Sequence, residues 1–250
     1  AQGKMYRREN KNEDFLGSIQ LNYNNTWGVH KLDLTATAEH QNNRKQFFFT
    51  TVKGLASNAF GYDNLMVGNI HPYKGTSSGY ESPKLTSFMG NLSYTLLNRY
   101  ALSLTLRADG STLVGHNNTW GFFPSTGLEW NLKEEKWLQD VKWLDHLKLQ
   151  TSVGRSGNLG GILAYYTQQA LVPSGIISYH GIPTVTLGQI RNANPNLKWE
   201  TRTSFNLGLK TGLLHNRIQL YAEYYYSKTT DMLYNYDVSV PPFAFNKLLA

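Results

Sequence analysis

Four aromatic or imidazole side chains between residues 155 and 197 are the best candidates for ligand contact, namely Tyr165, Tyr166, Tyr179 and His180. The segment is about 40 residues long by our strand assignment, and loops of this length usually bind or gate. Aromatic faces beside the amides of Gln168 and Gln169 suit stacking on sugar rings. Packing within the loop or against a neighbouring domain is the competing explanation for the same residues.

No arrangement typical of catalysis or metal binding stands out. The seven histidines have no His-x-x-x-His spacing, and the chain has no cysteine. Ser111 and Ser156 lie near glycines, but neither is in a Gly-x-Ser-x-Gly motif. The sequence Asp109-Gly110-Ser111 lacks the further carboxylates of a calcium loop and indicates a turn. We therefore expect no enzyme activity, no cofactor and no metal site.

Composition narrows the class of protein further. The 250 residues carry a net charge of +7, but their 24 lysines and arginines are scattered, which argues against a nucleic-acid partner. No stretch approaches the roughly 20 apolar residues of a membrane-spanning helix. Aromatic residues make up 13% of the chain and charged residues only 16%, against about 25% in ordinary soluble domains. With 22 glycines, this composition is typical of β proteins.

Alternation with a period of two dominates the chain and predicts an all-β fold. Between residues 99 and 107, the even positions Tyr100, Leu102, Leu104 and Leu106 are apolar or aromatic, and the odd positions are mostly polar or small. Similar segments recur along the chain, and we count about eight strands.

Short loops between the predicted strands fix which faces match, because paired strands must place their apolar sides together. Loops 96–98, 215–216 and 25–26 satisfy this condition. They predict three pairs across the hairpins: Tyr94 with Tyr100, Leu213 with Ile218, and Leu21 with His30.

Tight and long connections alternate along the chain. Residues 132–144 hold a short amphipathic piece, and the long connections are predicted at about 40–84, 110–119 and 155–197. Short turns at one rim and long loops at the other are typical of an antiparallel, up-and-down transmembrane β-barrel. Residues 1–250 would then be part of one barrel domain, with an apolar face toward lipid and a polar face toward the lumen. The alternative is a soluble β-sheet module that binds carbohydrate or acts in adhesion.

Several motifs resemble the SusC/RagA family of TonB-dependent outer-membrane transporters of Bacteroidetes, in the family's order. Residues 104–111 (Leu-Thr-Leu-Arg-Ala-Asp-Gly-Ser) look like its Arg-x-Asp-Gly-Ser turn. Residues 118–125 (Asn-Thr-Trp-Gly-Phe-Phe-Pro-Ser) are similar to its Trp-Gly-x-Phe-Pro-Ser strand, and 194–200 (Asn-Pro-Asn-Leu-Lys-Trp-Glu) to its Asn-Leu-Lys-Trp-Glu strand start. The remaining matches are 91–94 with 99–100, 147–154 with 157–158, and 216–218 with 224–231.

This resemblance implies a biological role, which composition and periodicity alone do not indicate. It implies a segment of a 22-stranded barrel in the outer membrane of a Gram-negative bacterium, with the plug domain and the barrel's C-terminal end absent from this chain. The whole protein would import oligosaccharides or peptides with energy from TonB. Its partners would be a SusD-like surface lipoprotein, the TonB complex acting through the missing N-terminal region, and the lipid bilayer.

Overall fold

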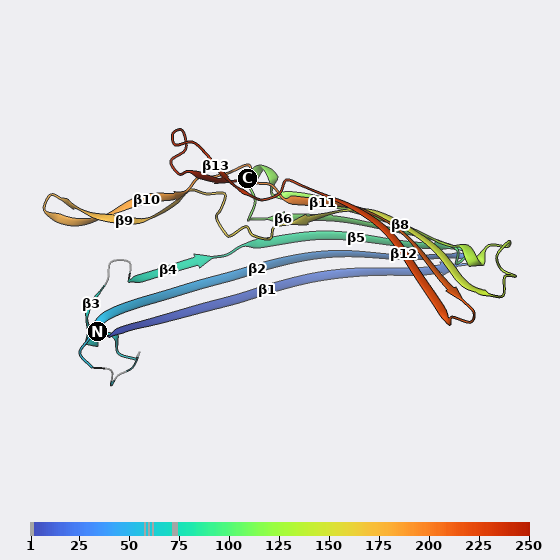
Figure 1. Cartoon of the computed structure of the whole chain (residues 1–250), viewed down its shortest axis with the longest axis horizontal. Helices are drawn as coiled ribbons and strands as arrows, with labels where there is room; N and C mark the ends of the chain where they lie inside the picture. Colours follow the sequence, from blue (N-terminus) through green and yellow to red (C-terminus); the bar gives the residue numbers. More distant parts are fainter. Residues whose placement is uncertain (1–2, 58, 60, 62, 72–74) are drawn as a thin grey trace.

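The computed structural model describes residues 3–57, 59, 61, 63–71 and 75–250. Its main element is a ten-stranded antiparallel sheet in which eight strands follow one another in the order β1-β2-β5-β6-β7-β8-β11-β12, as Figure 1 shows. These strands are β1 (Lys4–Trp27), β2 (His30–Leu55), β5 (Lys84–Leu96), β6 (Tyr100–Ser111), β7 (Trp120–Asn131), β8 (Leu144–Asn158), β11 (Glu200–Leu213) and β12 (Ile218–Thr230). The all-β, up-and-down architecture predicted from the alternation is confirmed.

The remaining elements are short. The other strands are β3 (Gly68–Ile70) and β4 (Thr76–Glu81) against β2, the hairpin β9 (Ala170–Tyr179) with β10 (Ile182–Arg191), and the pair β13 (Asn235–Asp237) with β14 (Lys247–Leu249). The three single-turn 3₁₀ helices are η1 (Leu65–Val67), η2 (His116–Asn118) and η3 (Leu132–Glu134). Within the described residues, no helix is long and apolar enough to cross a membrane.

Pairing across the sheet collects the apolar residues on one side. Leu102 lies opposite Tyr94 on β5 and opposite Leu128 on β7. Further along the sheet, Leu209 lies opposite Leu149 on β8 and Ala222 on β12. Because side chains alternate between the faces of a strand, this register produces one apolar face and one polar face, as the sequence predicted.

The apolar face is open. Ile19 is 72% exposed, Leu21 is 70% exposed and Leu220 is 57% exposed. The buried hydrophobic residues are few, and most of them gather at the long-loop end of the sheet. This distribution fits a wall whose apolar face meets lipid better than a soluble sheet, which would cover the same face with a core.

The short turns reproduce the predicted faces but only one of the three predicted registers. Leu213 lies opposite Ile218, as expected. Tyr94 lies opposite Leu102 rather than Tyr100, because the β5–β6 loop is 97–99 instead of 96–98. Leu21 lies opposite Ala36 rather than His30, because β1 continues to Trp27 and the chain reverses at Gly28, whose φ of +56° suits a turn.

The predicted long loop at 40–84 was wrong over much of its length. Strand β2 continues to Leu55 and pairs with β1 from His30 to Lys53, which lies opposite Lys4. Strand β4 then lies beside β2 from Lys45 to Thr50. Residues 41–46 are polar or charged on both faces, and the three phenylalanines at 47–49 that follow are apolar on both. The apolar alternation that marks a lipid-facing strand is therefore lost, although the backbone remains extended.

The other long connections hold local structure too. Residues 110–111 belong to β6, so the predicted loop at 110–119 begins at residue 112 and contains η2. Residues 107–111 were expected to form a turn and instead lie in strand β6. Strand β8 runs to Asn158, and the rest of the predicted loop at 155–197 contains the β9–β10 hairpin.

An aromatic group marks the short-turn rim around Glu135, in the connection between β7 and β8. The Tyr100 hydroxyl donates to Glu135 Oε1 at 2.5 Å, and the Trp130 indole donates to the same atom at 3.0 Å. The two rings stack with centroids 6.2 Å apart. These hydrogen bonds, with Arg99 nearby, hold the pKa of the Glu135 carboxyl below its ordinary value. Such aromatic groups are typical of the membrane interface of barrels.

The placement of the two rims predicts a labelling pattern. In the full-length protein, cysteines at Ser78 on β4 and Ser239, between β13 and β14, should both react with a membrane-impermeant maleimide on intact cells, because both lie at the long-loop end. A cysteine at Lys136, in the short-turn connection, should react only after permeabilisation. Reaction of only one long-loop position, or early reaction at Lys136, would contradict this topology.

Candidate functional site

The polar face of the sheet forms a shallow cavity of about 380 Å³ across β5, β6, β7, β8, β11 and β12. Small residues leave room for it: Ala101, Ser103, Gly127, Ser152 and Gly208. Amide and carboxylate side chains complete the lining: Glu129, Gln150, Asn206 and Glu223. Hydrogen-bonding groups around an open, wet surface suit binding of polar molecules or of another polar protein surface.

Glu129 is at the centre of a charge network on this face. Lys148 on β8 donates to Glu129 Oε1 at 2.8 Å, and the amide of Gln150 donates to Oε2. The Lys210 ammonium lies 5.4 Å from the centre of the Tyr221 ring. Because the Glu129 carboxylate already has cationic and amide partners, we assign the network to positioning and polar contact rather than to proton transfer.

A second network lies nearer the long loops, around Arg107. Its guanidinium Nε is 2.9 and 2.7 Å from the two carboxylate oxygens of Asp109, and Nη2 donates to Ser87 Oγ at 3.2 Å. Asp109 is only 7% exposed. The Arg-x-Asp-Gly-Ser sequence therefore cross-links β5 and β6 on one face instead of forming a turn.

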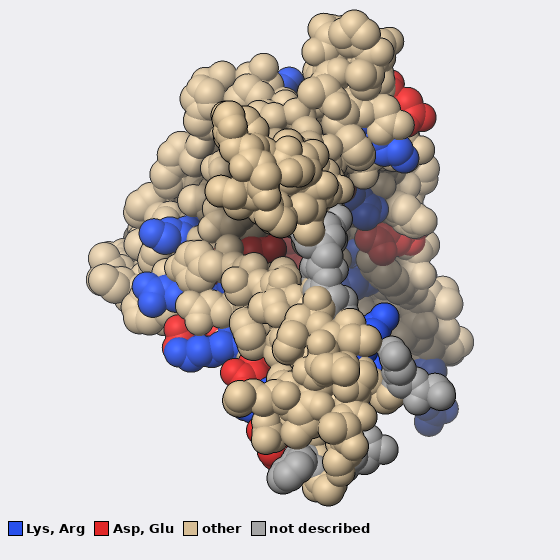
Figure 2. All heavy atoms as spheres, turned by 90° about the vertical axis from the view of Figure 1, so that its left-hand side faces the viewer, with Lys and Arg blue, Asp and Glu red and all other residues tan. Residues whose placement is uncertain are grey.

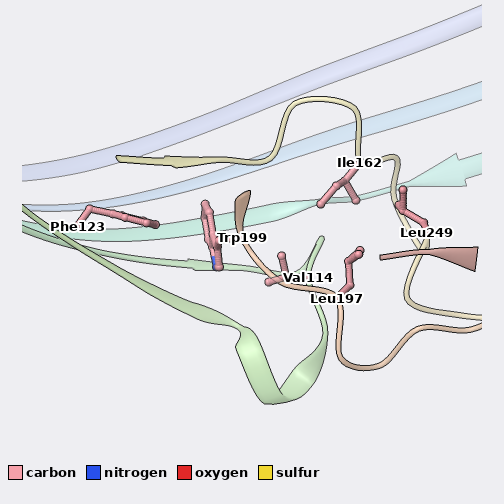
Figure 3. Packing of buried hydrophobic residues seen from close by; sticks show 6 residues of the cluster. All are labelled: Val114, Phe123, Ile162, Leu197, Trp199 and Leu249. Carbon is pink, nitrogen blue, oxygen red and sulfur yellow. The ribbon is translucent and has the colours of Figure 1, made fainter. Parts of the chain in front are cut away.

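A compact hydrophobic cluster joins the long connections to the end of the sheet (Figure 3). Its buried members are Val114, Phe123, Ile162, Leu197, Trp199 and Leu249. The rings of Phe123 and Trp199 meet edge to face, with centroids 5.5 Å apart. The Trp199 indole also donates to the Thr119 carbonyl at 3.3 Å. This cluster fixes the β6–β7 and β8–β11 connections to each other.

Close backbone approach beside the cluster requires a glycine at position 115. A Cβ there would lie 1.8 Å from the Pro195 carbonyl oxygen. Gly115 also donates its N–H to the Leu197 carbonyl at 2.9 Å. The motif residues at 194–200 therefore contribute packing and backbone contact, and the ligand-contact candidates lie elsewhere in the same connection.

Tyr165 and Tyr166 lie at the base of the β9–β10 hairpin, where Arg191 holds their segment. The Arg191 guanidinium donates to the carbonyls of Tyr165 and Gln168 at 2.9 and 3.2 Å. It also lies 4.5 Å from the centre of the Tyr166 ring, which packs against the hydrophobic cluster. Tyr165 is 40% exposed and has a φ of +65°. Of this pair, only Tyr165 is exposed, whereas Tyr166 is half-buried.

Tyr179 and His180 lie at the other end of the hairpin, at its tip. Their rings meet edge to face at 4.4 Å, and Tyr179 is 62% exposed. His180 and Gly181 form the two-residue turn, with φ values of +51° and +79°. A ten-residue strand such as β9 is about 30 Å long, so the four candidate residues form two separate groups rather than one site.

The hairpin between these groups exposes apolar side chains on both faces. Ile176 and Ile177, adjacent and therefore on opposite faces, are 53% and 52% exposed. No lysine, arginine, aspartate or glutamate occurs from residue 170 to 190. Figure 1 shows β9 and β10 projecting beyond the ends of β6 and β11, and Figure 2 shows that much of the upper part of this end of the molecule is uncharged. A surface of this kind is typical of an interaction site.

Sequence reasoning missed the charge network around Glu129 on the polar face and the contacts of Arg191. The alternation that placed Lys148 and Gln150 on the polar side was the available signal, but pairing with Glu129 depends on the register between β7 and β8. Arg191 is more than twenty residues from Tyr165, and sequence spacing does not bring them together. Across the described residues, no group of three or more His, Cys, Asp or Glu side chains could hold a metal ion.

Known proteins similar in sequence are TonB-dependent receptors much longer than this chain. TonB-dependent receptor P26 of Formosa agariphila is 32% identical over 213 residues, covering 85% of this chain and 21% of that protein. TonB-dependent receptor SusC of Bacteroides thetaiotaomicron is 38% identical over 164 residues, covering 62% of this chain and 16% of that protein. The chain thus spans about a fifth of these relatives.

Solved structures show the same fold over nearly the whole chain. The RagAB peptide transporter aligns with a TM-score of 0.78 at 24% identity, covering 98% of this chain and 27% of the matched chain. Its closed-closed state aligns with a TM-score of 0.80 at the same identity, covering 26% of the matched chain. The family model "TonB dependent receptor-like, beta-barrel" matches residues 2–246. The chain therefore belongs to the TonB-dependent receptor β-barrel family and is a fragment of SusC/RagA type.

Proposed function

We propose that the protein containing this chain is a nutrient importer of the outer membrane of a Gram-negative bacterium, of SusC type, which takes up oligosaccharides or peptides with energy from TonB. The observation that carries the proposal is the two-sided sheet. Its apolar side is exposed, and its polar side holds the cavity around Glu129. Such a wall separates lipid from a wet passage.

The substrate proposal rests on the long-loop end. Tyr165, Tyr179 and His180 present rings and an imidazole to solvent, and such groups can stack on sugar rings or bind the side chains and amides of peptides. A solved structure of the same fold is named a peptide transporter, and a curated relative is named SusC. Both substrate classes therefore stay within the proposal.

The partner proposal rests on the β9–β10 hairpin. Its uncharged strands expose isoleucines on both faces, and one-sided packing on this chain cannot cover both. We propose that a SusD-like surface lipoprotein covers the hairpin at the cell surface. The TonB complex would act on parts of the protein other than the sheet described above.

The two substrate classes can be separated by uptake. A strain that lacks the full-length gene should lose uptake from either a mixture of fluorescent oligosaccharides of varied linkage or a mixture of fluorescent peptides, and the restored gene should recover it. Loss of one class names the substrate. Unchanged uptake of both, in a strain without related importers, would contradict the proposal.

Single substitutions test the ligand-contact residues. Tyr165→Ala or Tyr179→Ala should weaken uptake about 2- to 10-fold, since an aromatic contact contributes about 0.5–1.5 kcal/mol. Trp143→Ala, an exposed aromatic residue in the short-turn connection, is the matched control and should leave uptake unchanged. Normal assembly of each variant is checked by its heat-dependent mobility in gels. Wild-type uptake in both tyrosine variants would assign these residues to packing alone.

A further inference from the structure

Basic residues stand at the long-loop margin of the apolar face. Arg155 on β8 lies opposite Thr203 on β11, which lies opposite Lys228 on β12. All three are exposed. Two residues nearer the short turns, the same side carries Val153, Phe205 and Tyr226. The row of Arg155, Thr203 and Lys228, hereafter the basic row, therefore borders the apolar band on its outward side.

The basic row lies at the depth where a membrane interface is expected. A tilted strand crosses the hydrocarbon layer in about 9–11 residues. Lys228 lies ten residues after Ile218, the first residue of β12, and Thr203 lies ten residues before Leu213, the last residue of β11. If the short turns mark one interface, these residues reach the opposite one, on the long-loop side.

Arg155 and Lys228 lack an anionic partner within the described part of the chain. Among the residues that the structure describes, neither Arg155 nor Lys228 forms an ion pair. Arg155 donates from Nη2 to Thr201 Oγ1 at 3.3 Å, which leaves most of its five N–H donors free for another acceptor. The neighbouring Lys198 is different, because it lies 3.9 Å from Asp231.

Spacing allows the two cations to act together. Adjacent strands are about 4.8 Å apart, so the backbones at Arg155 and Lys228 are about 10 Å apart across β11. Their long side chains can converge from this distance, and the Thr203 hydroxyl between them can donate a hydrogen bond. Arginine binds phosphate through two parallel hydrogen bonds, and lysine acts on it as a point charge.

We propose that the basic row binds the phosphate groups of a phosphorylated lipid in the outer leaflet of the membrane. Charge complementarity identifies the headgroup, and continuity with the apolar band around Phe205 and Tyr226 provides contact for the acyl chains. The inference rests on the proposed membrane location and on no particular transported substrate. A lipid in this place would fix the height of β8, β11 and β12 in the outer leaflet.

Lipid binding by the purified full-length protein tests the proposal. The probe is diphosphorylated lipid A in neutral detergent, and its binding is measured by native mass spectrometry. The double variant Arg155→Gln/Lys228→Gln should bind about 30-fold more weakly, since each basic residue near an anionic lipid surface changes affinity about fivefold. Lipid A without phosphates should bind the wild-type protein as weakly as diphosphorylated lipid A binds the double variant.

Two further variants separate charge from folding. Arg202→Gln removes a cation from the opposite face of β11, where Arg202 contacts Ser227, and should leave lipid binding unchanged. Arg155→Lys keeps the charge and should retain most of the binding. The proposal would be overturned if the double variant bound diphosphorylated lipid A as tightly as the wild-type protein does. It would also be overturned if the wild-type protein bound lipid A without phosphates as tightly as the diphosphorylated form. If inorganic phosphate displaced lipid A, the ligand of the basic row would be a free anion instead of a lipid, which would also overturn the proposal. Normal uptake with lost lipid binding would leave the transport proposal intact.

Discussion

Replacement of Trp199 by alanine is expected to lower the free energy of unfolding of the full-length protein by about 3–5 kcal/mol. Trp199 is 8% exposed and packs edge to face against Phe123. The substitution removes that contact, leaves a cavity, and frees the Thr119 carbonyl from its indole partner. Denaturant unfolding of the protein refolded in detergent measures the change.

An exposed tryptophan provides the control for this experiment. Trp137, in the connection between β7 and β8, is 66% exposed, and Trp137→Ala should change stability by no more than about 0.5 kcal/mol. Trp199→Phe should lose less than Trp199→Ala, because it retains a ring against Phe123. Similar losses for Trp137→Ala and Trp199→Ala would show that the cluster at the long-loop end contributes little to folding.

Leu104→Arg is expected to destabilise the protein by about 2–4 kcal/mol in lipid, the cost of a cation at the bilayer midplane. Leu104 lies on the apolar side of β6, between Leu92 on β5 and Thr126 on β7. It is four residues from Tyr100, which begins the strand at the aromatic rim, and so lies near the middle of the band. Refolding into lipid vesicles measures the loss.

Two further substitutions distinguish a lipid-facing wall from a buried core. Ser103 points to the polar face and is exposed beside the cavity, so Ser103→Arg should be tolerated. Ile218→Arg, at the turn end of β12, should cost only about 0–1 kcal/mol because it lies at the interface. Tyr100 is a poorer depth control, because it also binds Glu135. Equal damage from Leu104→Arg and Ile218→Arg would favour a soluble core.

Sequence periodicity predicted the faces of the sheet more reliably than its registers. Whether a loop has an odd or an even number of residues decides which strand faces match. Leu102 therefore lies on the apolar face as predicted, although its partner is Tyr94, which was predicted to pair with Tyr100. The exact partner depends on which residues adopt left-handed turn conformations. In the β5–β6 loop these are Leu97 and Asn98, with φ values of +55° and +58°, and leucine gives no signal for such a conformation.

The candidate site was only partly predictable, because its geometry depends on a hairpin hidden in a long loop. The β-branched residues of 172–186 and the His180-Gly181 pair were signals for that hairpin. They would have separated Tyr179 from Tyr165. The contact of Arg191 with Tyr166 depends on the folding of the hairpin base, and no local pattern encodes it.

The hydrogen-bonded row through Tyr100, Trp130, Leu149 and Leu209 has a geometric consequence. At Tyr100 the row lies beside the short turn, whereas at Leu209 it is four residues inside the end of β11. From Trp27 through His30 and Leu96 to Tyr100 the same row stays beside the short turns, so the shift falls between β7 and β8. Four residues span about 13 Å along a strand. Partners in one hydrogen-bonded row therefore occupy different layers of a membrane on either side of the β7–β8 connection, whereas β8, β11 and β12 keep their rows at nearly the same height.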